Sequence, residues 1–136
     1  MLFLLFQLGN DRYALEASRV VEVVPLLDMK QLPQAPRGVA GIFNYLGQPV
    51  PAVDLCALML QRPAHEALST RIFVTRCPGA DGSGRLLGLI AEQATGTIRR
   101  DRRDFVATGM RLDQAPYLGP VANDPRGLIQ WLHEDR

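Results

Sequence analysis

The chain has 136 residues, enough for one domain with a single core or two small half-cores. Its hydrophobic fraction of 47% and charged fraction of 21% are those of an ordinary globular protein. The net charge of +1 provides no overall field that would recruit nucleic acid or an anionic membrane. This balance favours a protein partner or a neutral ligand.

The N-terminal run MLFLLFQL has the pattern of a strand and lacks the features of a targeting signal. No basic segment precedes the apolar residues, Gln7 interrupts them, and turn residues follow at 9–11. The run is also much shorter than the roughly 20 apolar residues of a membrane-spanning helix. We therefore expect a soluble, cytoplasmic protein whose first strand covers residues 2–8.

Short β-branched or alternating segments separated by turn residues predict strands along most of the chain. In the first half they lie at residues 2–8, 12–16, 20–24, 39–46 and 49–53. In the second half they lie at residues 70–76, 85–92, 95–99, 117–122 and 127–132. The polar segment 61–69 is the expected midpoint, which divides the chain into halves of roughly residues 15–65 and the remainder.

Two prolines shape the strand at residues 49–53. Pro49 and Pro51 leave two alternate positions without a hydrogen-bond donor, so this strand is expected at an edge or a bulge. Asp54 follows and is placed to cap a short helix at residues 55–60. That helix is apolar nearly all round, which predicts that it is buried.

Many short strands at close spacing, with one short helix, predict an all-β protein made of small antiparallel barrels. The sequence lacks the strand-helix alternation that a parallel α/β sheet requires. No internal repeat is visible in the sequence.

The residues that usually carry chemistry form no recognisable catalytic or metal site. His65 and His133 lie in polar segments away from any nucleophile motif, so both are expected on the surface. Cys56 and Cys77 lack metal-ligand spacing and are too few for a disulfide framework, so both are expected to be ordinary buried thiols. The sequence therefore predicts no enzyme, no metal and no cofactor.

Two further segments were candidates for ligand binding. GADGSG at residues 79–84 lacks the Lys-Ser/Thr ending of a phosphate-binding loop and precedes a strand, which predicts a hairpin loop. RRDRRD at residues 99–104 alternates in sign and has no aromatic cluster beside it, which predicts a solvated turn. A small barrel that binds nucleic acid or a small ligand is the alternative to a protein-binding scaffold, and RRDRRD is its best support.

Four stretches, in order, carry a family resemblance. FQLGNDRYALEASRVVEVV is similar to an opening that ends in an aliphatic-x-Glu-aliphatic strand. QLPQAPRGVAGIFNYLGQPVPAVDL is similar to a hallmark with a proline loop, then Gly-aliphatic-x-Asn-aromatic/Leu-Arg-Gly and Pro-aliphatic-x-Asp-Leu. RLLGLIAEQATGTIRR and YLGPVANDPRGLIQWL resemble a second-half hairpin and a closing pair of strands. Together they resemble the CheW-like domain, the coupling scaffold of bacterial chemosensory arrays, over nearly the whole chain.

The resemblance implies one CheW-like domain at residues 1–136, made of two five-stranded SH3-like barrels that share a hydrophobic junction. It implies no catalysis and no cofactor. The implied partners are the regulatory domain of a CheA-type histidine kinase and the cytoplasmic tip of a methyl-accepting chemoreceptor, without nucleic acid or direct membrane insertion. Family members usually continue into a C-terminal helix, whereas this sequence stops soon after the last predicted strand, so either the chain is truncated or the helix is absent. We expect a C-terminal truncation, because Trp131 and Leu132 would otherwise lack a cover.

The resemblance and the strand pattern together nominate a partner-binding surface. We expect the helical hairpin of the receptor tip to dock in an apolar groove between the two barrels. For each aliphatic candidate, a place in the core is the competing interpretation. The expected partner-binding residues are Val20, Glu22, Val24, Gly41, Asn44, Leu46, Gly47 and Ile90.

Leu46 departs from the family pattern, in which an arginine usually occupies this position and pairs with the glutamate that corresponds to Glu22. Glu22 is therefore expected to find another cation, Arg37 or Lys30, or to stay in water. An interface that includes Leu46 should be more apolar and should prefer different partners. A specialised array, for example a Wsp-type surface-sensing pathway, is one candidate.

Overall fold

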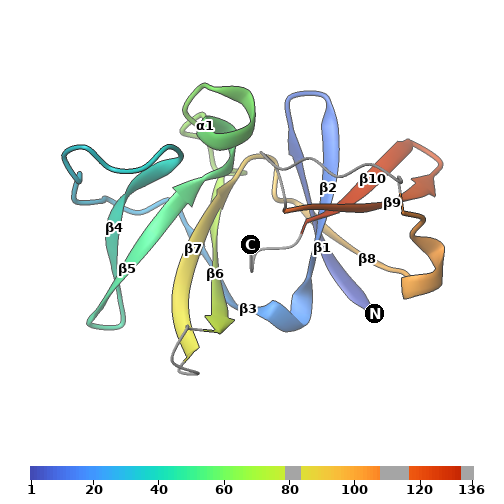
Figure 1. The fold of residues 1–136 in the computed structure, drawn as a ribbon, viewed down its shortest axis with the longest axis horizontal. Helices are drawn as coiled ribbons and strands as arrows, with labels where there is room; N and C mark the ends of the chain where they lie inside the picture. The colour runs from blue at the N-terminus through green and yellow to red at the C-terminus, as the bar shows by residue number, and fades with distance from the viewer. Residues whose placement is uncertain (79–83, 108–116, 133–136) are drawn as a thin grey trace.

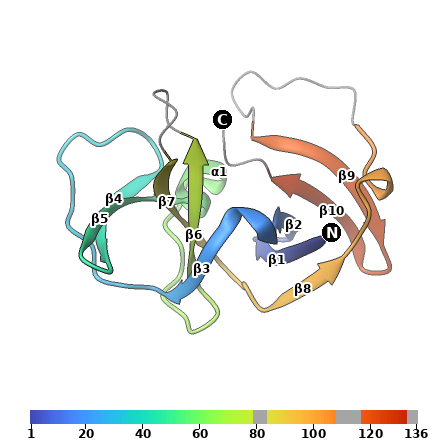
Figure 2. The same cartoon turned by 90° about the horizontal axis from the view of Figure 1, so that it is seen from below.

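A computed structural model describes residues 1–78, 84–107 and 117–132. In these ranges, ten strands, one α-helix and two 3₁₀ turns form two lobes that lie side by side (Figures 1 and 2). The strands are β1 Leu2–Leu8, β2 Asp11–Glu16, β3 Val20–Pro25, β4 Val39–Tyr45, β5 Gln48–Asp54, β6 Arg71–Pro78, β7 Gly84–Ala91, β8 Gly96–Arg99, β9 Leu118–Asp124 and β10 Gly127–Leu132. The helical elements are η1 Ala17–Arg19, α1 Leu55–Leu60 and η2 Arg102–Asp104.

Each lobe is a five-stranded sheet, which confirms the expected fold class, and each sheet contains one parallel pair among its antiparallel pairs. One sheet has the order β8-β1-β2-β10-β9 and the other has the order β3-β6-β7-β5-β4. The pairs β2/β10 and β5/β7 are parallel, while the other neighbouring strands pair antiparallel. The parallel pairs arise because their strands belong to different hairpins, which long connections bring together.

Two runs of three strands, β1-β2-β3 and β6-β7-β8, exchange their third strands between the two sheets. β1 and β2 form a hairpin, but β3 leaves them and pairs with β6 in the other sheet. Likewise, β6 and β7 form a hairpin, and β8 returns to pair with β1. Figure 2 shows both crossings between the lobes. With the expected division at roughly residues 15–65 and the remainder, the sheet β3-β6-β7-β5-β4 takes β3, β4 and β5 from residues 15–65 and takes β6 and β7 from the remainder. In the other sheet, β1, β8, β9 and β10 lie in the remainder.

A single-residue bridge brings the two edges of each sheet together. Beyond β3, Lys30 exchanges two backbone hydrogen bonds with Ile42 of β4, at 2.8 and 2.9 Å. Beyond β8, Val106 does the same with Val121 of β9, at 2.7 and 3.0 Å. These bonds satisfy edge groups that would otherwise be open to another strand, and they curve each sheet towards a closed barrel.

Three clusters of buried side chains fill the molecule, one inside each sheet and one at the junction between them. At the junction, the ring of Phe6 on β1 lies 5.7 Å from the ring of Phe73 on β6, centroid to centroid. Leu55 and Cys56 of α1 join this cluster, whereas Leu60 at the far end of the helix is 37% exposed. The hydrophobic junction is thus present, but the helix is fully buried only in its first turn.

Gly88 of β7 has no space for a side chain. A Cβ there would lie 2.6 Å from Cε1 of Phe43 and 2.9 Å from Cγ2 of Ile72. We expect Gly88→Ala to lower the free energy of unfolding by about 1–3 kcal/mol through overpacking, as measured by urea denaturation. Gly96→Ala is the matched control, since nothing lies within 4 Å of its Cβ position. Equal stability of the two variants would contradict this interpretation.

Candidate functional site

The β4–β5 hairpin ends in a two-residue turn that presents an apolar side chain to solvent. Leu46 and Gly47 have φ angles of 50° and 82°, the combination found in a type I′ turn. Asn44 Oδ1 accepts a hydrogen bond from Gly47 N at 2.8 Å, which holds the turn. Leu46 is 87% exposed in a left-handed conformation that residues with side chains rarely adopt. An exposed leucine in a disfavoured conformation marks this tip as a candidate contact.

Glu22 binds a tyrosine hydroxyl instead of either cation that was expected. Tyr45 Oη donates a hydrogen bond to Glu22 Oε1 at 2.5 Å, and this bond to a carboxylate raises the pKa of Tyr45. Arg37 instead donates to the carbonyl oxygen of Leu58 at 3.0 Å. Because β3 and β4 are opposite edges of one sheet, the Glu22–Tyr45 bond joins the base of the hairpin tip to the far edge.

Gly41 has a structural reason to be glycine. It has a φ of 154°, and a Cβ at this position would lie 2.5 Å from the carbonyl oxygen of Lys30. The neighbouring residue, Ile42, forms both hydrogen bonds of the bridge to Lys30. Gly41 therefore allows the close approach that joins the sheet edges.

Strand β3 exposes different valines from those expected. Val20 and Val24 are half-buried and pack against core clusters, whereas Val21 and Val23 are 45% and 36% exposed. The pairing of β3 with β6 shifts register between Val20 and Glu22. An inserted residue at such a bulge breaks the alternation of faces, so the sequence pattern could not reveal which valines face outwards.

A groove of about 200 Å³ lies between the two sheets, where one was expected. Its walls include Leu4 and Leu5 of β1, Val23 of β3 and Gly96 of β8. Val23 is the β3 valine that lines it, and the four aliphatic candidates Val20, Val24, Leu46 and Ile90 do not. Ile90 is only 3% exposed and belongs to the core cluster of its own sheet.

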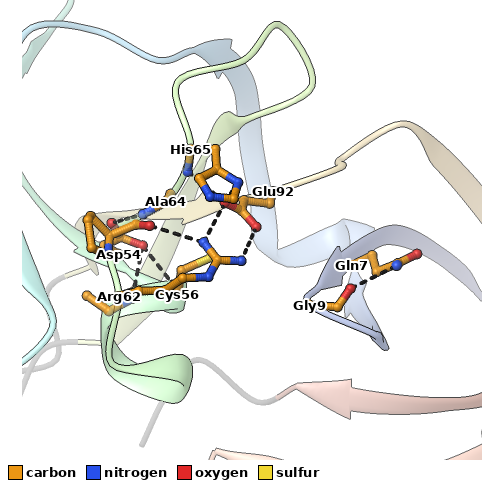
Figure 3. Close-up of polar contacts among 10 residues, drawn as sticks. Gln7, Gly9, Asp54, Cys56, Arg62, Ala64, His65 and Glu92 are labelled. Carbon is orange, nitrogen blue, oxygen red and sulfur yellow. Dashed lines mark hydrogen bonds and ion pairs between the residues drawn. The ribbon is translucent and has the colours of Figure 1, made fainter.

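A second group of polar side chains surrounds the loop after α1 (Figure 3). Asp54 Oδ1 caps α1 by accepting from the backbone N–H groups of Cys56 and Ala57, at 2.9 and 3.2 Å. Its other oxygen accepts from Ala64 N at 2.9 Å. Arg62 donates two hydrogen bonds to buried Glu92, at 2.9 and 3.0 Å. Both carboxylates are thus satisfied within the loop.

Glu92 and Cys56 in this polar group both have pKa values far from neutral pH. The hydrogen bonds from Arg62 lower the pKa of Glu92 to about 2, against the opposing effect of burial. Burial raises the pKa of Cys56 to about 12, with a further contribution from Glu92. Glu92 therefore stays ionised and the Cys56 thiol stays protonated, so the geometry fits a structural anchor better than proton transfer.

The model of the CheW-like domain matches residues 2–136. This chain belongs to the CheW-like domain family. Its fold is similar to the crystal structure of the scaffolding protein TtCheW from Thermoanaerobacter tengcongensis, with a TM-score of 0.82 at 21% identity, covering 98% of this chain and 84% of that one. At this identity the likeness shows the shared fold.

Sequence relatives agree with the family assignment. The chemotaxis protein CheW of Treponema pallidum is 38% identical over 50 residues, which cover 37% of this chain and 29% of that protein. The chemotaxis protein CheW of Helicobacter pylori is 24% identical over 103 residues, 76% of this chain and 59% of that protein. Protein FrzA of Myxococcus xanthus is 28% identical over 113 residues, 83% of this chain and 68% of that protein. The first two matches thus span less than two thirds of those relatives.

The arginine-rich segment RRDRRD, at residues 99–104, packs against strands β9 and β10 of this CheW-like domain. In RRDRRD, Arg100 pairs with Asp124 at 2.9 Å, and the guanidinium of Arg102 lies 5.8 Å from the centroid of the Trp131 ring. The His65 side chain is 74% exposed. His133, most of GADGSG and the side chain of Cys77 lie outside the described part of the chain.

Two kinds of feature are absent from the described ranges. No group of three or more His, Cys, Asp or Glu side chains there could hold a metal ion. Likewise, no helix in those ranges has the length and hydropathy that a membrane crossing requires.

The lowered pKa of Glu92 predicts a pH dependence of stability. Because the folded state favours the ionised form, Glu92 stabilises the fold fully above the unfolded pKa of about 4.3. This contribution is lost as the pH falls from about 5 to about 2. We expect Glu92→Gln to cost about 1–3 kcal/mol at neutral pH and to flatten the acid limb of stability measured by urea denaturation.

Glu66→Gln is the control for this prediction, because Glu66 is an exposed carboxylate on the loop after α1, next to His65, whose N–H donates to Glu92. Its acid limb should match that of the parent protein. If Glu92→Gln shows the same acid limb too, Glu92 does not carry the effect.

Proposed function

We propose that this CheW-like domain is a noncatalytic adaptor that couples a chemoreceptor to a CheA-type histidine kinase in a cytoplasmic chemosensory array. The observation that carries the proposal is the family match over residues 2–136. The shared fold with a protein described as a scaffold supports it. Two of the relatives are chemotaxis proteins, and their names indicate no particular pathway for this chain. A Wsp-type pathway therefore stays a prediction.

The groove between the sheets is the proposed receptor contact. A helix docks through a row of apolar side chains into an apolar groove, and Leu4, Leu5 and Val23 provide such walls. Thr95 and Thr97 line the same groove and add hydroxyl groups. Arg71 also lines the groove, so a receptor helix that combines apolar side chains with an acidic or polar group would complement its chemistry.

The tip of the β4–β5 hairpin is the proposed kinase contact. Leu46 is exposed there, and the hydrogen bonds from Gly47 N–H to Asn44 and from the Tyr45 hydroxyl to Glu22 hold the turn that carries it. A turn that is already ordered loses little backbone freedom on binding. The family arginine would favour an acidic surface, whereas Leu46 favours an apolar patch on the kinase regulatory domain.

The adaptor proposal is tested by calorimetric titration with the regulatory domain of the CheA-type kinase and with the receptor tip, both from the genome of this protein. We expect saturable one-to-one binding of each. Absence of binding to both partners would contradict the proposal.

Leu46→Arg tests the hairpin tip. Because Leu46 is exposed in a turn, we expect the free energy of unfolding to change by less than about 0.5 kcal/mol. Affinity for the kinase regulatory domain should fall about tenfold, since an arginine would lose its hydration against an apolar surface. Receptor-tip affinity should be unchanged.

Leu128→Arg is the matched control, because Leu128 is an exposed leucine, at 59%, on the other sheet. It should leave kinase affinity within experimental error. If Leu46→Arg unfolds the protein, Leu46 is needed for folding and its assignment to an interface is wrong. If the Leu46→Arg variant binds the kinase regulatory domain as tightly as the parent does, the hairpin tip does not contact the kinase.

A further inference from the structure

A larger groove, of about 710 Å³, lies at one end of the sheet formed by strands β3 to β7. The tip of the β4–β5 hairpin lies at the opposite end of that sheet. Leu26, Leu27 and Met29, which follow β3, form one wall. Ala67 and Leu68, from the loop before β6, form the other. This groove shares no lining residue with the groove between the sheets, so it is a separate surface.

The loop that forms the second wall is held in place at both ends. At its start, the N–H groups of Ala64 and His65 donate to Asp54 and Glu92, at 2.9 and 2.6 Å. At its end, the carbonyl oxygen of Ser69 accepts from Ala94 N at 2.9 Å. Between these anchors Leu68 is 97% exposed. A braced loop that presents a leucine to water is pre-organised for a contact.

The rim of the groove is acidic. Asp28 and Glu66 line it and are exposed, and neither forms an ion pair with a described residue. Its lining contains no lysine or arginine. Lys30 is not among the lining residues, although Met29 and Gln31 on either side of it are. An occupant with positive charge therefore complements this rim.

The shape favours a protein segment over a small molecule. Leu27 and Leu68 line the groove and are 37% and 97% exposed, so both leucines present apolar surface to water beyond the side that faces the groove. A helix or strand laid across the groove would cover both leucines and fill the space between them. The occupant thus needs aliphatic side chains as well as charge.

We propose that this groove binds a protein segment that combines aliphatic side chains with lysine or arginine. This contact goes beyond the adaptor function, because its surface is separate from the groove between the sheets and from Leu46. The domain can hold this partner together with the kinase and the receptor.

Three labelled synthetic peptides of equal length test the proposal by fluorescence anisotropy on the whole chain. The first peptide places leucines on one face of a helix and lysines on the other. The second peptide has glutamate in place of each lysine of the first, and the third has serine in place of each leucine of the first. We expect the leucine–lysine peptide to bind about tenfold more tightly than either of the others. In ¹H–¹⁵N spectra, its shifts should gather at residues 25–31 and 64–70.

Variants of the groove complete the test. Leu68→Ser should weaken binding of the leucine–lysine peptide about tenfold, while Leu128→Ser on the other sheet should leave it unchanged. The double variant Asp28→Lys, Glu66→Lys should prefer the leucine–glutamate peptide. All four substitutions are at exposed positions, and thermal melts check that each variant folds.

The proposal is overturned if no peptide binds, if spectral shifts spread over the surface, or if Leu68→Ser binds as the parent does. Neither kinase nor receptor enters this assay, so its failure leaves the adaptor proposal to its own titrations.

Discussion

The exchange of β3 and β8 between the two sheets is the constraint on which the rest of the structure depends. β3 follows the β1–β2 hairpin but pairs with β6, and β8 follows the β6–β7 hairpin but pairs with β1. Neither sheet has its five strands without the exchanged strand. The contact of Phe6 with Phe73 and the shared cluster around it lie where the strands cross. Burial of this apolar surface favours the exchanged arrangement over two separate half-domains.

The exchange also creates the groove between the sheets. Val23 reaches its wall on the incoming β3, and Gly96 and Thr97 reach it on the incoming β8. The surface proposed for the receptor is therefore a product of the same crossings that hold the lobes together. A partner in this groove contacts strands from both halves of the chain at once.

Backbone closure and side-chain hydrogen bonds position the surfaces outside this groove. The Lys30–Ile42 bridge and the Glu22–Tyr45 bond join the two edges of the β3–β7 sheet and fix the hairpin that carries Leu46. At the other end, Asp54 and Glu92 brace the loop that carries Leu68. Glu92 also accepts from Gln7 N of the other sheet through its carbonyl oxygen, at 3.2 Å. One buried carboxylate residue thus ties the loop, the crossover to β8 and strand β1 together.

Local chemistry, read from the sequence, determined the strands, the cap of α1 and the tip of the hairpin. Strand alternation, turn residues and a capping aspartate act over a few residues, so Asp54, Asn44 and Gly47 could be placed without the fold. The motifs at residues 41–55 likewise indicated the family, which the match over residues 2–136 confirmed.

Only the tertiary structure decided which strands pair, which valines face out and what surrounds each charge. Parallel pairing and strand exchange join residues far apart in the chain, and a bulge at Val20–Glu22 reversed the expected faces of β3. Ile90 is buried in the core because β7 is a central strand of its sheet. Glu22 accepts a hydrogen bond from Tyr45 because closure of the sheet brings its opposite edges together. Long-range contacts of this kind depend on packing of the whole chain, which no local pattern encodes.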